Sequence, residues 1–324
     1  MKKSFRNIVP ALLIFGVMCG NASAKDYPDH PITLVVPWSV GGSTDVLARA
    51  AVKQLSEELG QTIVVENRAG ASGMVGACEV VRAKPDGYTL VFNTNSTYAI
   101  VPHLYKNFPC DFQNGLIPVG LVATNQQVLT ISSSLGVNNL KSFIDYLKKE
   151  PGKVAFGSAG VGGTSHLAME QLMSMSGTSM LHVPYKGGSD SLQALLGNQI
   201  QAVFVDVSSA IPVLDSGRVV GLGTSSKEPV PALKSIKPIN QLGLPDFDSY
   251  TSFGLFAPAK TPQPVIDKLN HALNVALKAD SLKSLLLRNG YKPGGGSSQD
   301  LSKMMKTESQ HWGELIEQRN IKLE

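Results

Sequence analysis

Short apolar runs alternate with helical patterns along the whole chain, and this alternation constrains the fold more than any other feature. The predicted strands are the apolar runs Ile32–Val36, Ile63–Glu66, Tyr88–Phe92, Val119–Ala123, Val128–Ile131, Val154–Phe156, Ala202–Val205, Val219–Leu222 and Phe253–Phe256. The predicted helices between them include Thr44–Glu58, Met74–Ala83, Leu140–Lys149, Thr164–Ser176 and Ile211–Ser216. Because this order is that of βαβ units, the sequence predicts an α/β fold with largely parallel sheets.

Glycine and proline residues indicate where several helices begin or end. Glycines follow three of the predicted helices, at Gly60, Gly177 and Gly217, where a left-handed residue commonly ends a helix. A further helix is expected to open at Pro262–Pro264, and a turn at 293–298 to precede a last helix over 299–318. A chain of 324 residues with 43% apolar content exceeds the usual single core, so two lobes are expected.

The beginning of the chain has the pattern of a secretory signal peptide. Lys2, Lys3 and Arg6 precede an apolar run over 8–18, and Ala22-Ser23-Ala24 follows as a cleavage site, so residues 1–24 are expected to be removed. The run is shorter than the ~20 residues that a membrane-spanning helix needs. Cys19 raises the alternative of a lipoprotein, but Met18 is too large for the residue that precedes a lipidated cysteine.

Charge and cysteine content limit the classes of partner. Removing the signal peptide lowers the formal net charge of +4 by three, and the remaining Lys and Arg are scattered among acids, which argues against a nucleic-acid partner. Cys78 and Cys110 remain after processing. In an oxidising compartment they could form a disulfide, and the alternative is two small buried thiols.

Common catalytic and metal-binding patterns are missing from the sequence. It contains no G-x-S-x-G, H-E-x-x-H or G-x-x-x-x-G-K-[ST] motif, and its six histidines are widely spaced. The glycine-rich stretch over 160–165 lacks the third glycine of a dinucleotide-binding fingerprint. We therefore expect a protein that is not an enzyme and that has no catalytic residues, metal or cofactor.

Two stretches share an order that is typical of anion sites. Ile32–Arg49 and Val154–Met169 each run from an apolar strand through a glycine-rich turn with small hydroxyl residues into a helix. The first backbone N–H groups of such a helix have no partner within the helix, and the macrodipole adds about half a positive charge there. Two helix N-termini from distant parts of the chain could therefore clamp one anion.

Motifs spread along the chain resemble those of one family. They are PW..GGSTD..AR around Pro37–Arg49, ENRAGASGMVGA at Glu66–Ala77, KPDGYTL, FGSAGVGGTSHLAME, VPYKGG at Val183–Gly188 and FVD.SSAIP. Together they resemble the periplasmic solute-binding proteins of tripartite tricarboxylate transporters, the Bug or TctC family. The resemblance implies a periplasmic location and a two-lobed, type II-like periplasmic binding protein fold with the ligand between the lobes.

The same resemblance implies the course of the chain. Lobe 1 is expected to comprise residues 25–123, lobe 2 residues 124–224, and residues 225–324 to return to lobe 1. Strands at 119–124 and 219–225 are the expected crossings, with a hinge near Thr124 and Thr224.

The candidate ligand-binding residues lie in the two glycine turns and at strand ends: Trp38, Gly41, Gly42, Ser43, Thr44, Asp45, Asn93, Ser158, Gly160, Gly162, Thr164, Ser165, His166 and Asp206.

Each candidate also has a structural explanation. The hydroxyl residues could cap helices, Trp38 could belong to the core, and Asp206 could form interlobe hydrogen bonds. Asp45 could order its turn or accept a donor group of the ligand. His166 is expected to be neutral and to donate one hydrogen bond, because a protonated ring opposes the helix dipole. Arg68 stays an outside candidate for holding a carboxylate.

The expected function is capture of a small carboxylate by a monomer that closes by hinge motion and presents the ligand to membrane transporter subunits. One alternative is a ligand-loaded signalling module that docks on a membrane sensor ectodomain. Another is a secreted hydrolase that uses Ser43 or Ser158.

Overall fold

The computed structural model describes residues 27–318 and 320–322. The expected signal peptide, and Cys19 with it, lies outside the described residues. Within the described part of the chain, no helix is both long and apolar enough to cross a membrane.

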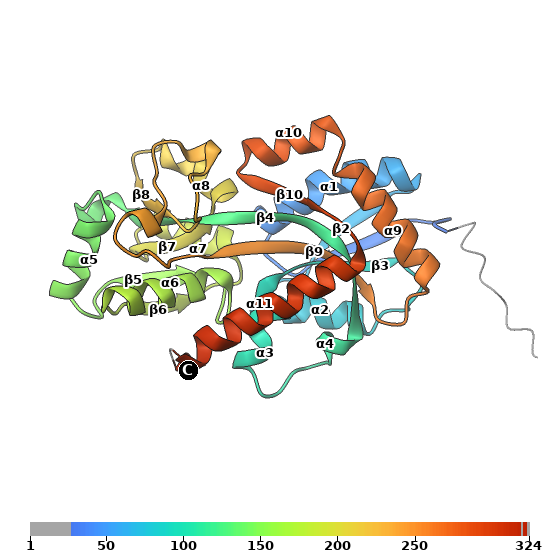
Figure 1. Ribbon diagram of the computed structural model, residues 1–324, viewed down its shortest axis with the longest axis horizontal. Coiled ribbons are helices and arrows are strands. Elements are labelled where there is room, and N and C mark those ends of the chain that lie inside the picture. The colour runs from blue at the N-terminus through green and yellow to red at the C-terminus, as the bar shows by residue number, and fades with distance from the viewer. Residues whose placement is uncertain (1–26, 319, 323–324) are drawn as a thin grey trace, which may run out of the picture.

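The first lobe is built on a parallel group of three strands. Strand β1 (Ile32–Val36) lies between β2 (Ile63–Asn67) and β3 (Thr89–Thr94). The helices around these strands are α1 (Ser43–Leu59), α2 (Met74–Val81), α9 (Gln263–Ala276) and α10 (Asp280–Arg288) (Figure 1). The core forms because alternate residues of β1, among them Ile32 and Leu34, pack against the apolar faces of α1 and α9.

The second lobe repeats this plan. Strand β5 (Ala155–Ser158) lies between β6 (Leu181–Pro184) and β7 (Ala202–Asp206), and both pairings are parallel. The remaining elements of this lobe are α5 (Leu140–Lys149), α6 (Thr164–Ser176), α7 (Gly188–Leu196), α8 (Val207–Leu214) and β8 (Val219–Thr224). Helices α1 and α6 end at left-handed Gly60 and Gly177, as their sequences predict.

Two long strands join the lobes. β4 (Leu116–Ser132) and β9 (Tyr250–Pro258) run antiparallel to each other through the middle of the molecule (Figure 1). β4 also pairs with β10 (Tyr291–Gly295) in lobe 1 and with β7 and β8 in lobe 2, all antiparallel. The sheets are therefore mixed rather than largely parallel, because the crossing strands run against their neighbours.

β4 shows why the sequence pattern divides one strand into two. The expected runs at 119–123 and 128–131 are parts of it, separated by a polar stretch that looks like a loop. The side chains of Asn125 and Gln127 are nevertheless buried. Asn125 donates to Ser208, and Gln127 accepts from Ser249, so both amides make hydrogen bonds inside the junction of the lobes.

The chain returns to lobe 1 later than expected. After β8, the segment with the 3₁₀ turns η4 (Pro231–Leu233) and η5 (Ile239–Gln241) stays with lobe 2, where Ile239 and Phe247 pack into the same core as Phe156. We therefore propose that the return begins at β9 rather than at residue 225.

Several short elements have no clear sequence signal. They are η1 (Ala71–Gly73), the π-turn η2 (Ser96–Ile100), α3 (Val101–Leu104), α4 (Phe112–Gly115) and η3 (Ser133–Leu135). The turn expected over 293–298 overlaps the second half of strand β10 (Tyr291–Gly295). The proline and glycines of β10 are tolerated because it pairs only with β4 within the described sheet.

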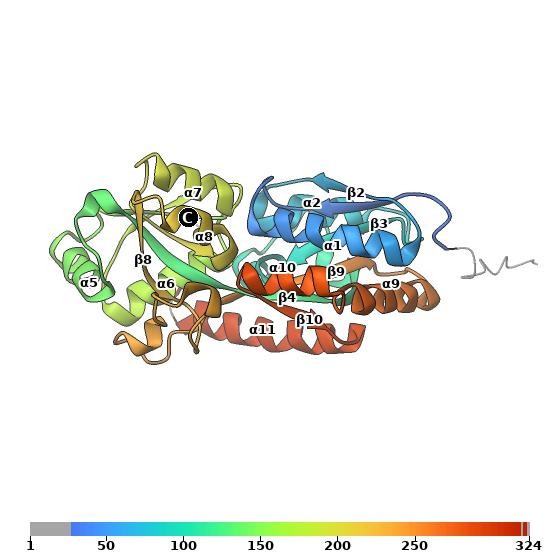
Figure 2. The same cartoon turned by 90° about the horizontal axis from the view of Figure 1, so that it is seen from above.

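The last helix and the disulfide complete lobe 1. Helix α11 (Ser298–Gln318) runs alongside both lobes below β4 and β9 (Figures 1 and 2). Cys78 of α2 and Cys110 form a disulfide, which decides between the two alternatives left open by the sequence.

Candidate functional site

The turn after β1 delivers an uncapped helix end to the junction between the lobes. Gly41 has φ +77°, which permits the tight turn, and Gly42 is the N-cap residue of α1. Gly42 has no side chain to cap the helix, while Ser43 and Thr44 are its first two helical residues. The first N–H groups of α1 are therefore left for another acceptor.

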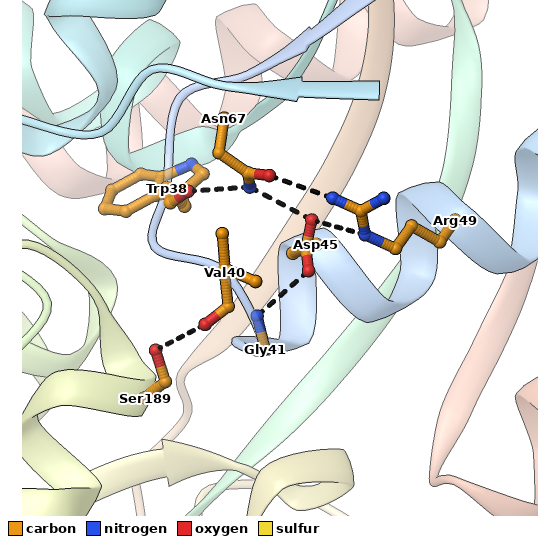
Figure 3. A network of polar contacts seen from close by, with 7 residues as sticks. All are labelled: Trp38, Val40, Gly41, Asp45, Arg49, Asn67 and Ser189. Carbon is orange, nitrogen blue, oxygen red and sulfur yellow. Dashed lines mark hydrogen bonds and ion pairs between the residues drawn. The ribbon is translucent and has the colours of Figure 1, made fainter. Parts of the chain in front are cut away.

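A polar network around Asp45 holds this turn in place (Figure 3). The Asp45 carboxylate accepts from the Gly41 N–H at 2.9 Å and from Arg49 Nε and Asn67 Nδ2, each at 3.0 Å. Asn67 also donates to the Trp38 carbonyl at 3.1 Å. Burial opposes ionisation of Asp45, but the hydrogen bonds from Arg49, Gly41 and Asn67 outweigh it and lower its pKa. The Asp45 carboxylate therefore orders the turn through its hydrogen bonds.

The turn after β5 has the same shape and different internal bonds. Gly163 is the N-cap residue of α6 and again provides no side-chain cap. The Ala159 N–H donates to Ser165 Oγ at 3.0 Å, and the Gly162 N–H donates to His166 Nδ1 at 3.2 Å. His166 therefore accepts from its own turn through one ring nitrogen, while its Nε2 lies 3.5 Å from Glu170.

Stacked rings support this second turn from inside lobe 2. Ser158 Oγ lies 2.6 Å from His182 Nε2, and the His182 ring stacks nearly parallel to the rings of His166, at 4.0 Å, and Phe156, at 4.8 Å between centroids. Burial, and then the neighbouring His166, lower the pKa of His182 to about 3. Ser158 is fully buried in this cluster and does not line the cavity between the lobes.

The two turns meet across a small cavity of about 40 Å³. It has room for no more than a few water molecules, because the lobes are closed. The candidates that line it are Trp38, Gly42, Ser43, Thr44, Thr164, Ser165 and Asp206. The candidates that do not line it are Gly41, Asp45, Asn93, Ser158, Gly160, Gly162 and His166.

Other lining residues were missed by sequence reasoning. They are Ser39, Ser96, Gln127, Ala159, Gly188, Phe204, Val205, Ser209 and Thr251. Thr94 also lines the cavity; with Asn93 it lies at the carboxyl end of β3, where ligands collect in α/β proteins, and Ser96 could have been found for the same reason. Gln127 and Thr251 sit on the crossing strands, so only the pairing of β4 with β9 brings them to the cavity.

Hydrogen bonds between the lobes hold the cavity closed. Ser39 donates to Asp190 of α7 at 2.6 Å. Ser189 of α7 donates to the Val40 carbonyl at 3.2 Å, as Figure 3 shows. The Thr164 N–H donates to Ser96 at 3.0 Å. Water can form hydrogen bonds to each of these groups once the lobes separate.

Two polar atoms of the cavity residues have no partner in the part of the chain that the structure describes. They are Trp38 Nε1 and Thr94 Oγ1, and both are buried. An unpaired buried polar group costs about 1–3 kcal/mol. A ligand or water that pairs with them would remove this cost, so both atoms are candidate contacts.

Among the described residues that line the cavity, Asp206 is the one with a charged side chain. It accepts from Ser43 Oγ of lobe 1 and, at 2.8 Å, from Thr251 Oγ1 of β9. Burial raises its pKa to about 6, although the hydrogen bonds from Ser43, Thr251 and Gln127 act in the opposite direction.

Arg68 and possible metal ligands do not belong to this site. Arg68 pairs with Glu66 at 2.7 Å and Glu79 at 3.1 Å on the surface and does not line the cavity. Over residues 27–318 and 320–322, no cluster of His, Cys, Asp and Glu has the composition to hold a metal ion.

Comparison with known proteins identifies the family. The model of the "Tripartite tricarboxylate transporter family receptor" family, TctC, matches residues 47–321. A UPF0065 protein of Bordetella pertussis is 33% identical over 298 residues, which cover 92% of each chain.

Solved structures agree with this result. Rpa4515 of R. palustris, solved with adipate, is 31% identical with a TM-score of 0.89 and covers 92% of this chain and 99% of its own. MatC of Rhodopseudomonas palustris, solved with bound malate, is 27% identical with a TM-score of 0.85 and covers 90% of this chain and 100% of its own. The two-lobed fold, the motifs and the family match agree, and the chain belongs to the Bug/TctC family of periplasmic solute-binding receptors.

Proposed function

We propose that this protein captures a small carboxylate between its lobes in the periplasm and delivers it to membrane subunits of a tripartite tricarboxylate-type transporter. The observation that carries the proposal is the cavity between two uncapped helix N-termini, α1 from lobe 1 and α6 from lobe 2. Both ends direct N–H groups and positive dipole ends toward one space, which suits an anion.

Main-chain groups are the proposed donors for the ligand carboxylate. The described side chains that line the cavity include no lysine, arginine or histidine, so the positive potential must come from the backbone. Thr94 Oγ1 and the Trp38 N–H, which have no partner among the described residues, are available to orient the ligand, whereas the hydroxyls of Ser43 and Thr164 would have to exchange their bonds to Asp206 and Thr251. The adipate and malate in the related structures are of the proposed ligand class.

Closure is the proposed link between binding and delivery. A ligand that contacts both helix ends stabilises the closed state by its difference in affinity for the closed and open states. The interlobe bonds of Ser39, Ser189 and Thr164 would form in the same step. Small-angle scattering should therefore show a smaller radius of gyration with saturating ligand, whereas an unchanged radius would contradict the clamp.

Native mass spectrometry followed by calorimetric titration tests the ligand class. Protein purified from the periplasm should retain a small acid, visible as an added mass, and after its removal should bind carboxylates with one site. The same mass would show whether residues 1–24 have been removed. Absence of binding by every carboxylate in a panel from succinate to citrate would contradict the proposal.

Two variants of neighbouring residues test the main-chain donors. Gly42 has φ −73°, which a side chain tolerates, but an added Cβ would lie 3.3 Å from the Ser39 carbonyl and 3.7 Å from Ser189 Oγ. Gly42→Val should therefore fold yet weaken binding by about a hundredfold or more, since it obstructs the helix end and closure. Ser43→Ala should cost about 0.5–1.5 kcal/mol, the value of one hydrogen bond. Equal, small losses in both variants would show that α1 does not hold the anion.

A further inference from the structure

Asp206 occupies a position that the proposed carboxylate-binding function does not explain. It ends β7 and is the N-cap residue of α8, yet its side chain makes no capping bond to that helix. Its carboxylate instead meets Ser43 at the start of α1 and Thr251 on β9. An aspartate at an N-cap ordinarily caps its own helix, whereas the Asp206 side chain lines the cavity instead.

The carboxylate of Asp206 is poorly placed for a site that only takes anions. Two unit charges about 5 Å apart repel by about 3 kcal/mol at an effective dielectric constant of 20. Of the described residues that line the cavity, none brings a positive side chain to offset this repulsion. A second ionised carboxylate of the ligand, next to Asp206, would meet the full repulsion.

The groups that face Asp206 come from five elements and are neutral donors or acceptors. Ser43 lies on α1, Gln127 on β4, Thr164 on α6 and Thr251 on β9, and they are linked by hydrogen bonds. Tyr291 of β10 donates to the Ser43 carbonyl at 2.9 Å. Burial first, and the charge of Asp206 as well, raise the pKa of Tyr291, so this phenol stays protonated.

From this geometry we infer that Asp206 determines specificity: it selects a carboxylate ligand whose other end carries a hydrogen-bond donor, an amine or a hydroxyl group, over one that presents a second ionised carboxylate there. The inference rests on the proposed function and refines it. The ligand carboxylate binds the helix ends, and its donor group binds Asp206 in place of Ser43 or Thr251. Amino acids and hydroxy acids are the class that meets both requirements.

The position of Asp206 also predicts that the protein takes up a proton when a dicarboxylate binds. A dicarboxylate can still bind if Asp206 takes up a proton, which then forms a hydrogen bond to the ligand. Burial already raises the pKa of Asp206 to about 6, so the protonated form is accessible at mildly acidic pH. Dicarboxylates should therefore bind more tightly as pH falls through this range and take up a proton, while amino and hydroxy acids should not.

Calorimetric titration of wild type and Asp206→Asn tests this inference. The ligands are dicarboxylates from succinate to adipate, each beside the ω-hydroxy and ω-amino monocarboxylates of the same chain length. Wild type should favour the amino or hydroxy acid, and Asp206→Asn should bind the dicarboxylate about tenfold or more tightly than wild type does, while losing the preference for the amine. Titration in buffers of different ionisation enthalpy should show proton uptake with dicarboxylates in wild type and none in the variant.

Asp215→Asn is the matched control, because it removes the same charge at the exposed end of α8. It should bind as wild type does, and thermal unfolding should show that both variants are folded. If wild type binds carboxylates but Asp206→Asn ranks the ligands identically and takes up the same number of protons, the inference about Asp206 is overturned and the proposed function stands. If wild type binds no carboxylate, with or without a donor group, both are overturned.

Discussion

The turns before α1 and α6 have the same backbone design but are held by different chemistry. Before α1, the charged side chains of Asp45 and Arg49 tie the turn to Asn67 near the edge of the sheet. Before α6, the rings of His166 and His182 and the Ser158 hydroxyl support the turn from within lobe 2. Both arrangements leave the helix end uncapped.

This comparison distinguishes the parts of each turn that would contact the ligand from the parts that hold the turn in its folded position. Both turns place a glycine at the N-cap of a helix whose first residues line the cavity, although the Thr164 N–H of α6 donates to Ser96 across the closed lobes. What differs lies behind the cavity and acts on the ligand only by positioning the turn. Perturbing each support should therefore damage its own turn, under conditions set by its own chemistry.

The largest effect is expected from Gly162→Val in the turn before α6. Gly162 has φ +78°, and an added Cβ would lie 2.8 Å from Leu104 Cδ1. Backbone strain and overpacking each cost about 1–3 kcal/mol, so urea unfolding should show a loss of about 3 kcal/mol or more. Gly42→Val is the control at a glycine with an ordinary φ of −73°. A similar loss of stability in Gly42→Val would show that the positive φ and the Leu104 contact of Gly162 are not the cause.

A smaller loss of stability is expected from Asp45→Ala in the turn before α1. The variant removes three hydrogen bonds to a carboxylate that is 3% exposed, which should cost about 2–3 kcal/mol. Arg49→Ala removes one half-exposed partner and should cost less than about 1 kcal/mol. Chemical unfolding, with ligand titration in parallel, measures the loss of stability in both variants. If Arg49→Ala lost as much stability as Asp45→Ala, Asp45 would not be the centre of the network.

The two supports should also fail in different pH ranges. The pKa of His182 is about 3 in the fold and about 6.5 when unfolded, so the unfolded state binds more protons between these values and stability falls as pH drops from about 6.5. Asp45 has a lowered pKa in the fold, so its contribution is complete above about pH 3.9 and is lost only in stronger acid.

His182→Gln tests this difference. The variant should be less stable at neutral pH, because the stacked ring is lost, yet its stability should fall less between pH 6.5 and 4 than that of wild type. Stability curves from urea unfolding across this range give the comparison, with Asp45→Asn as the control that should keep the wild-type slope there. Parallel curves for wild type and His182→Gln would contradict the buried, neutral state of His182.

The smallest effect is expected from Arg68→Ala. Arg68 forms half-exposed ion pairs with Glu66 and Glu79, away from the cavity, so stability should change by less than about 1 kcal/mol and carboxylate affinity should not change. If Arg68→Ala abolished binding while Gly42→Val bound normally, a guanidinium and not the helix ends would hold the ligand.

Local patterns were enough to predict much of the fold. Apolar runs and glycine signals located β1, α1, β5 and α6, because each depends on residues close together in the sequence. The two glycine turns were found for the same reason, and the family motifs placed both on one ligand site. Polar residues inside β4, and proline and glycines in β10, hid strands that only pairing with distant strands stabilises.

The direction of each side chain was decided only in the tertiary structure. Ser43, Ser158, Asp45 and Asp206 all lie at strand ends or helix starts, and their sequence positions do not distinguish cavity from support. Asp45 turns toward Arg49 of its own helix and Asn67 of β2, and Ser158 turns toward His182 of β6, so all these partners lie in the same lobe. Asp206 meets Ser43 because closure brings β7 to α1, a contact between residues 163 positions apart. Sequence therefore determined the two uncapped helix ends, whereas the packing of the lobes decided which side chains share the cavity with them.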